Sequence, residues 1–231
     1  MFRARSTGGG NPSTGIFVRD MLGETSGIGI VRQAGRRTTV PGPNNLNTTF
    51  FEFPSFPRMS ISSYHIATRG NHGPVLQYEI DDENTTKVGN TGLYFNLVAE
   101  NDIETDSTSP NLQTGMAKLG SVPEYSIYEV PGLDEEYAGT VFDVFPGSPA
   151  IEDDGIIGFK GNYAKGNESQ TGVFYRQLVQ QVGGGDGKVF VVANSDTEIP
   201  PPIEECQTKT FGSTSPPSIA NSKMVFIGLA M

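Results

Sequence analysis

Short acidic clusters are the residues of this chain whose type and spacing come nearest to a metal or reactive site. The candidates are Asp81-Asp82-Glu83, Asp134-Glu135-Glu136, Glu152-Asp153-Asp154 and the glycine-rich loop Gly183–Gly187. Calcium takes about six to eight oxygen ligands, which such clusters could supply. Each cluster lies in an expected turn between strands, where Asp and Gly are common for backbone reasons. We therefore expect no metal and no cofactor, with calcium in one acidic loop as the alternative.

Signatures of nucleophilic or hydrolytic catalysis are missing from the sequence. His65 and His72 are the only histidines, and Cys206 is the only cysteine, so an internal disulfide and a cysteine metal cluster are excluded. No Gly-x-Ser-x-Gly, Walker loop, His-Glu-x-x-His, EF-hand or dinucleotide pattern occurs. The sequence therefore predicts a protein that is not an enzyme. A hydrolase on a propeller-like scaffold is the third-ranked hypothesis.

Charge is divided unevenly along the chain. Residues 1–70 contain eight arginines and three acidic residues, a net charge of +5, whereas the remainder carries −15. The overall charge of −10 argues against a nucleic-acid partner, which requires a basic surface. No apolar run approaches the roughly 18 residues of a membrane-spanning helix, so we expect no membrane partner. A basic first part and an acidic body suit head-to-tail contact between copies, the alternative being a mere drift of surface charge.

A Thr-Gly dipeptide followed by an aromatic residue marks the elements that must position any site. Its three copies are Thr14–Phe17, Thr91–Tyr94 and Thr171–Phe174. Alternating apolar residues with β-branched and aromatic enrichment predict strands here. We expect each glycine to form the turn into the strand and each aromatic residue to fill the core. The repeat-structural residues of these copies are Gly15, Phe17, Gly92, Tyr94, Gly172 and Phe174.

A second repeated segment has the order Phe, Pro, Ile. Aligning the chain with itself places Ile61, Ile151 and Ile219 at matching positions, and each is followed by a strand that ends in a basic residue or glycine. A further strand is expected in each copy. These third strands are Ile28–Gln33, Tyr125–Val130 and Val189–Asn194.

The repeats together predict an all-β fold of about three blade-like antiparallel units. The expected segments are 1–70, which is basic, 71–161, which has long acidic loops, and 162–231, all within one compact unit. Propellers typically have about four or more blades, so we expect a propeller-like arrangement that is not closed. Its end strands, expected at Phe2–Arg5 and Val225–Leu229, would leave unpaired sheet edges. Neighbouring subunits are expected to extend or pair these sheets.

Several stretches resemble a family of tandem β-repeat proteins of unknown function. They are the Thr-Gly-Ile-Phe pattern, Val192–Pro200, Phe211–Ile219 and Val225-Phe226-x-Gly228. That family occurs mainly in bacterial surface proteins, is regarded as propeller-like and supplies no catalytic residues. The resemblance is best over 142–231 and poor over 96–125. More distantly, the three-copy arrangement resembles the pyrenoid shell proteins of diatoms, which form a protein sheet around the Rubisco condensate of the chloroplast.

The second resemblance implies a non-catalytic structural protein that self-assembles into a sheet, shell or tube. Its partner would be further copies of itself, with Rubisco or a condensate enclosed, in the chloroplast stroma or pyrenoid. The alternative is a secreted or cell-surface β-repeat module that binds glycan or protein. From the charge distribution we expect basic residues of one copy to contact acidic residues of the next. The candidates are Arg32, Arg36, Arg37, Asp134, Glu135 and Glu136.

Overall fold

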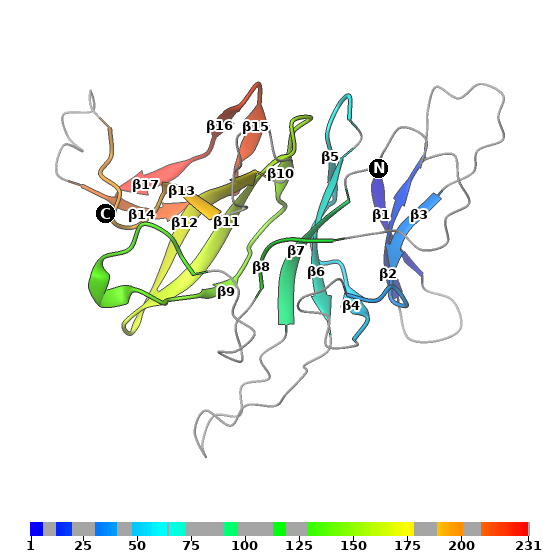
Figure 1. Ribbon diagram of the computed structural model, residues 1–231, viewed down its shortest axis with the longest axis horizontal. Helices are drawn as coiled ribbons and strands as arrows, with labels where there is room; N and C mark the ends of the chain where they lie inside the picture. The colour runs from blue at the N-terminus through cyan, green and yellow to red at the C-terminus, as the bar shows by residue number, and fades with distance from the viewer. Residues whose placement is uncertain are drawn as a thin grey trace, which may run out of the picture.

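The chain folds into a row of antiparallel β-sheets, as the computed structural model in Figure 1 shows. The residues it describes are 1–6, 13–19, 31–40, 48–63, 65–72, 90–96, 113–118, 129–177, 189–200 and 209–230. Within them the structure is β apart from one 3₁₀ turn, and no sheet closes into a barrel. The prediction of an all-β, antiparallel arrangement that is not a closed propeller is confirmed.

The first two sheets form the part of the row coloured blue to green in Figure 1. The first sheet has the order β1 (Phe2–Ser6), β2 (Ser13–Val18), β3 (Val31–Gly35). The second has the order β4 (Phe50–Glu52), β6 (Ile66–His72), β7 (Asn90–Asn96), β8 (Gln113–Lys118). A short strand, β5 (Arg58–Met59), also pairs with β6.

The third sheet follows the 3₁₀ turn η3 (Glu135–Tyr137). Its order is β10 (Ala150–Ile151), β11 (Ile156–Lys165), β12 (Glu168–Gln177), β13 (Val189–Ala193), with β9 (Phe142–Val144) also on β11. Two strand pairs then form what we call the C-terminal half-sheet. They are β14 (Phe211–Thr214) with β17 (Gly228–Ala230), and β15 (Ser218–Ala220) with β16 (Lys223–Val225).

The pairing register makes the sheets copies of one unit. The matching cross-strand pairs are Ala4–Gly15, Gly70–Gly92 and Gly161–Gly172. Strands β1, β6 and β11 are therefore equivalent, and so are β2, β7 and β12. On the other edge, β4 and β5 pair with β6 as β9 and β10 pair with β11. The expected segment boundaries after residues 70 and 161 fall within β6 and β11, so the division by sequence and the division by sheet differ.

Each Thr-Gly glycine lies inside a strand and not in a turn, which corrects the expectation from the sequence. Side chains two residues apart in a strand share a face. A Cβ atom on Gly172 would lie 2.6 Å from Cζ of Phe174, and one on Gly92 would lie 2.7 Å from the Tyr94 hydroxyl oxygen. The segment Gly15–Phe17 repeats this relation. Glycine is required because the ring two residues later folds back over it.

A second ring covers the facing glycine of the neighbouring strand. A Cβ atom on Gly161 would lie 2.5 Å from the ring of Phe142. Phe142 and Phe174 meet edge to face, with centroids 4.9 Å apart and planes at 83°, and Phe50 and Tyr94 meet likewise at 4.8 Å and 87°. Such pairs contribute beyond their burial. Two facing glycines thus make room for one buried aromatic pair in each complete sheet.

Met59, and not Ile61, occupies the position that matches Ile151 and Ile219. Each of the three pairs with a residue that lies four positions before a glycine of the next strand. The pairs are Met59 with Ile66 before Gly70, Ile151 with Ile157 before Gly161, and Ile219 with Met224 before Gly228. Ile61 is 91% exposed in the turn between β5 and β6. The predicted equivalence is wrong because six residues separate β5 from β6, against four between β10 and β11, so the Ser-Ile dipeptide falls after the strand.

The third strand of the second sheet is β8, and not the expected Tyr125–Val130. Residues 125–128 lie outside the described residues, and Glu129 makes an isolated bridge with Val141. The other expected third strands correspond to β3 and β13, although residues 28–30 are outside the described ranges.

The hydrophobic core lies between successive sheets. The largest cluster joins Ala67, Leu93 and Phe95 of the second sheet to the phenylalanine rings of the third. Another cluster joins Ile16 and Ala34 of the first sheet to aromatic rings of the second. Each sheet is therefore stabilised by the neighbour stacked on it, as in other repeat architectures.

Replacing Tyr94 by phenylalanine is expected to raise the free energy of unfolding by about 1 kcal/mol, because a buried hydroxyl without a partner is costly. The Tyr94 hydroxyl is fully buried and has no hydrogen-bond partner among the described residues. Tyr163 offers a matched control, since its hydroxyl lies 3.0 Å from Ser195 Oγ. Urea unfolding should show Tyr94→Phe more stable than the parent and Tyr163→Phe less stable. A loss of stability in Tyr94→Phe would contradict this account.

Candidate functional site

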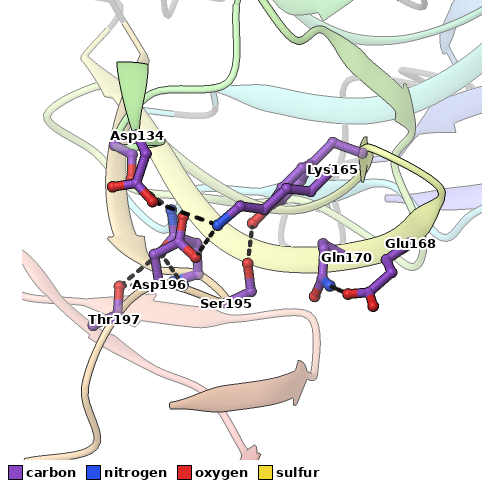
Figure 2. A network of polar contacts seen from close by, with 10 residues as sticks. Asp134, Lys165, Glu168, Gln170, Ser195, Asp196 and Thr197 are labelled. Atoms are coloured by element: carbon purple, nitrogen blue, oxygen red, sulfur yellow. Dashed lines mark hydrogen bonds and ion pairs between the residues drawn. The ribbon is translucent and has the colours of Figure 1, made fainter. Parts of the chain in front are cut away.

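A polar network surrounds Lys165 at the end of β11 (Figure 2). Its Nζ donates a hydrogen bond to Asp196 Oδ1 at 2.6 Å, lies 3.7 Å from Asp134 Oδ2 and sits 4.9 Å from the ring centroid of Tyr137. The hydrogen bond to Asp196 is the main cause that raises the pKa of Lys165. The ammonium group is therefore charged at neutral pH, which suits an ion pair and not a nucleophile.

The turn Asn194–Thr197 connects this network to the loop before the third sheet. The side-chain oxygen of Asn194 accepts hydrogen bonds from the Asp196 backbone N–H at 3.0 Å and from Thr197 Oγ1 at 2.9 Å. The side-chain amide of Asn194 donates to the Gly132 carbonyl at 3.2 Å. These contacts hold the residues just before η3, Gly132 and Asp134, beside the turn that follows β13.

A second acidic cluster, Glu152–Asp154, forms the tip of the β10–β11 hairpin. Asp153 Oδ1 accepts the backbone N–H groups of Ser62 and Ser63 at 2.6 and 2.8 Å. Both carboxylate oxygens of Glu152 accept the Ser222 backbone N–H at 2.9 Å. This hairpin tip therefore links the β5–β6 turn on one side to the β15–β16 turn on the other, along one edge of the row (Figure 1).

Removing the charge of Asp153 with Asp153→Asn is expected to lower Tm at neutral pH by a few degrees. The backbone N–H groups of Ser63 and Ser62 hold the pKa of Asp153 below its ordinary value of 3.8. A carboxylate with a lowered folded-state pKa stabilises the fold above its unfolded-state pKa, and this stability is lost as the pH falls through the folded-state pKa. The Tm difference should shrink on acidification in scanning calorimetry. Glu198→Gln, an exposed control, should leave Tm unchanged, and a pH-independent difference would contradict the assignment.

The charged residues expected to make assembly contacts lie at opposite ends of the row. Arg36 and Arg37 form the turn after β3, at the blue end in Figure 1, and η3 lies at the other end with the C-terminal half-sheet. Asp134, Glu135 and Glu136 are all exposed, but the Asp134 carboxylate already pairs with Lys165. Arg32 is a residue of β3. The structure therefore does not bring the basic and acidic groups together within one chain.

A basic cleft of about 590 Å³ lies at the same end as Arg36. The arginines that line it are Arg3, Arg5 and Arg36. Arg3 donates to the Phe53 carbonyl at 2.9 Å, and its guanidinium carbon lies 5.6 Å from the ring centroid of Phe56. Arg36 lies 5.6 Å from the ring centroid of Phe51. Positive charge and aromatic surface thus occur together at this end.

Exposed apolar side chains also occur at the two ends. Among the described residues, four of the eight large exposed hydrophobic side chains belong to end elements, Phe2 to β1 at one end and Val225, Ile227 and Leu229 to the segment β16–β17 at the other. Phe51 and Phe56 belong to the second sheet and lie beside Arg36 and Arg3 of the first. The three side chains of the β16–β17 segment are 64% to 71% exposed and alternate along β16 and β17. Apolar patches of this kind mark interaction surfaces.

The sequence identifies these end surfaces only in part. Arg3 and Arg5 belong to the predicted basic first part and to an end strand, but no charge contact is predicted for them. Val225–Leu229 is the other end strand with a predicted open edge, whereas only the structure shows that its Val225, Ile227 and Leu229 form one exposed apolar row. Their alternation was visible as a strand signal. A strand signal alone does not state whether the apolar face has a covering sheet.

The described residues hold no cluster of three or more His, Cys, Asp or Glu side chains placed to bind a metal ion. The acidic stretch 81–83 and the loop 183–187 lie outside the described residues. Within the described ranges, no helix is long and apolar enough to cross a membrane.

Comparison with known proteins gives no relative. No protein-family model matches the chain, and neither the curated proteins nor the solved structures include a significant match.

Proposed function

We propose that this protein is a non-catalytic structural protein that polymerises through contact between the two ends of its row of sheets. The observation that carries the proposal is the exposed apolar row Val225, Ile227 and Leu229 at one end of the row of sheets, together with exposed Phe2 at the other. One end carries Arg36 and Arg37, and the other carries the acidic turn η3. Because the two ends differ, contact between them is head to tail and continues from copy to copy.

The sheet edges support the same proposal. Within the described residues, no strand pairs with the outer edge of β1 or with the outer edge of β17. Open edges with apolar surface beside them invite pairing with another chain. Covering both ends by neighbouring copies would remove edges and apolar surface together, which favours an extended polymer over a free monomer.

Electron microscopy of the purified protein tests this function. Sheets, tubes or filaments are expected, and their amount should rise with protein concentration and fall at about 1 M salt, where the Debye length is about 3 Å. Isolated particles of monomer size at every concentration and ionic strength would rule the function out.

A shell around a Rubisco-containing condensate is the biological setting that we propose for the polymer. This part rests on the resemblance to the diatom pyrenoid shell proteins. Its test is microscopy of a fluorescently tagged protein in the source cells. A closed fluorescent layer around the Rubisco compartment is expected, and a signal at the cell surface would favour the binding-module alternative.

A further inference from the structure

The third sheet provides an internal template for a complete unit. Strand β11 is flanked by β9 and β10 on one edge and by β12 on the other. Its Phe159 lies between two further rings, with the Phe142 centroid 5.7 Å away at 66° and the Phe174 centroid 5.8 Å away at 31°. In the third sheet the cluster therefore has three rings, one from each of three neighbouring strands, whereas in the second sheet Thr68 takes the place of Phe159.

The two ends of the molecule hold the two halves of this cluster. At the C-terminal half-sheet, the ring centroids of Phe211 and Phe226 lie 5.7 Å apart with planes at 57°, which matches the pair Phe142–Phe159. At the first sheet, the centroids of Phe2 and Phe17 lie 5.6 Å apart with planes at 19°, which matches the pair Phe159–Phe174. Among the described residues, the C-terminal half-sheet therefore has no ring that corresponds to Phe174 of β12, and the first sheet has no ring that corresponds to Phe142 of β9.

We propose that two copies join by strand exchange, in which β16–β17 of one copy replaces β1 beside β2 of the next. This inference rests on the proposed function and specifies its joint. The template register places Gly228 opposite Gly15, as Gly161 lies opposite Gly172. The product is a composite sheet with β14 and β15 from one copy and β2 and β3 from the other. The β1 pairing that is lost is replaced by an equivalent pairing.

The choice of β1 as the displaced strand follows from one residue. Ala4 in β1 occupies the place that Gly70, Gly161 and Gly228 hold in the equivalent strands. The ring of Phe211 lies directly over Gly228, in the space that a Cβ atom would fill. A strand with alanine at this place does not fit beneath that ring, so β1 is unable to replace β17 beside β14. Strand β17 meets no such obstacle beside Gly15.

The exchange also covers the exposed apolar row of the C-terminal half-sheet. In the proposed joint Gly228 takes the position of Ala4, so Ile227 takes the position of Arg3 and Leu229 takes the position of Arg5. That face of the first sheet is turned to the second sheet, because Ile16, opposite Arg3, packs in the core between them. The exposed row on β16–β17 would therefore lie against the segment that contains Phe51 and Phe56.

A disulfide that fixes β1 to β2 tests the exchange. Ser6 and Ser13 are register partners at the end of this pair, so Ser6→Cys/Ser13→Cys in a Cys206→Ser background provides the bond. The matched control is Ala164→Cys/Ser169→Cys, also register partners, in the β11–β12 pair that does not exchange. Polymer mass is measured by pelleting, with and without reductant, after circular dichroism has confirmed folding.

Oxidation of the Ser6→Cys/Ser13→Cys protein is expected to lower the pelleted mass at least about tenfold, because a β1 strand bonded to β2 blocks the exchange. Reductant should restore the pelleted mass. The control should pellet equally in both states. Equal pelleting of the oxidised and reduced β1–β2 protein overturns the exchange while the proposed function stands. If the parent protein itself stays monomeric, the proposed function fails.

A cross-link between copies tests the register and does not depend on the first variant folding. The expected joint places Leu229 opposite Thr14 of the next copy, so a mixture of Leu229→Cys and Thr14→Cys chains in the Cys206→Ser background should yield a covalent dimer on oxidation. A mixture of Leu229→Cys with Arg3→Cys reports simple edge-to-edge contact with β1. A dimer only in the second mixture, or in neither, overturns the exchange.

Discussion

Replacing Phe142 by alanine lowers the free energy of unfolding by about 4 kcal/mol, because a fully buried ring is lost and a cavity remains. Phe142 is completely buried and contacts three other rings, those of Phe145, Phe159 and Phe174. It also fills the space above Gly161. A loss of this size is a large part of the stability of a typical domain.

Chemical unfolding followed by circular dichroism measures this effect, with Phe190→Ala as the control. Phe190 is 42% exposed and stacks on Tyr175 at the surface of the third sheet. Its replacement should cost clearly less. Equal losses in the two variants would show that the glycine–aromatic unit is not the centre of the core.

The charge reversal Arg36→Glu/Arg37→Glu raises the protein concentration needed for half-maximal assembly by about tenfold or more at low salt. The turn after β3 then repels the acidic end of the next copy, and like charges in contact oppose association. Light scattering over a concentration series gives the midpoint. Because surface charges are screened by salt, the difference between variant and parent should narrow as ionic strength rises.

A compensating exchange provides the control for this reversal. Glu135→Lys/Glu136→Lys alone should weaken assembly in the same way, since both side chains are exposed at the acidic end. A chain that carries both sets of substitutions should regain much of the loss. If the chain with all four substitutions assembles as weakly as each of the two double variants, direct contact between these two turns is excluded.

The fold class followed from the sequence because short-range signals determine it. The spacing of glycine and aromatic residue in Thr91–Tyr94 and Thr171–Phe174 correctly located β7 and β12. The role of the glycine was wrong, since a turn was expected where the strand is continuous. Its true cause is a ring lying over it, together with a facing glycine on the next strand, and that pairing appears only once the register is known.

Two further differences have equally local causes. Strand β8 has the sequence Gln-Thr-Gly-Met-Ala-Lys, which lacks β-branched apolar alternation, so pairing with β7 and not propensity makes it a strand. Ile61 was misaligned because a turn of different length moved it out of the repeat. The Ser-Ile dipeptide matches in sequence at Ile61 and Ile219 although it lies in a turn in the first case and in a strand in the second.

The candidate end surfaces were partly foreseeable. The excess of arginine before residue 70 predicted a basic region, and Arg36 and Arg37 do lie at one end. The apolar row Val225, Ile227 and Leu229 alternates as any half-buried strand does. Whether a neighbouring sheet covers it depends on tertiary stacking, which a single sequence does not encode in any local pattern.

Sedimentation velocity of the unmodified 231-residue chain over a wide concentration range tests the central claim most directly. Head-to-tail polymerisation predicts a broad, concentration-dependent distribution of species far heavier than the 24.8 kDa chain, which shifts back toward the monomer at high salt. A single sharp boundary at the monomer mass, unchanged by concentration and by salt, would contradict the account.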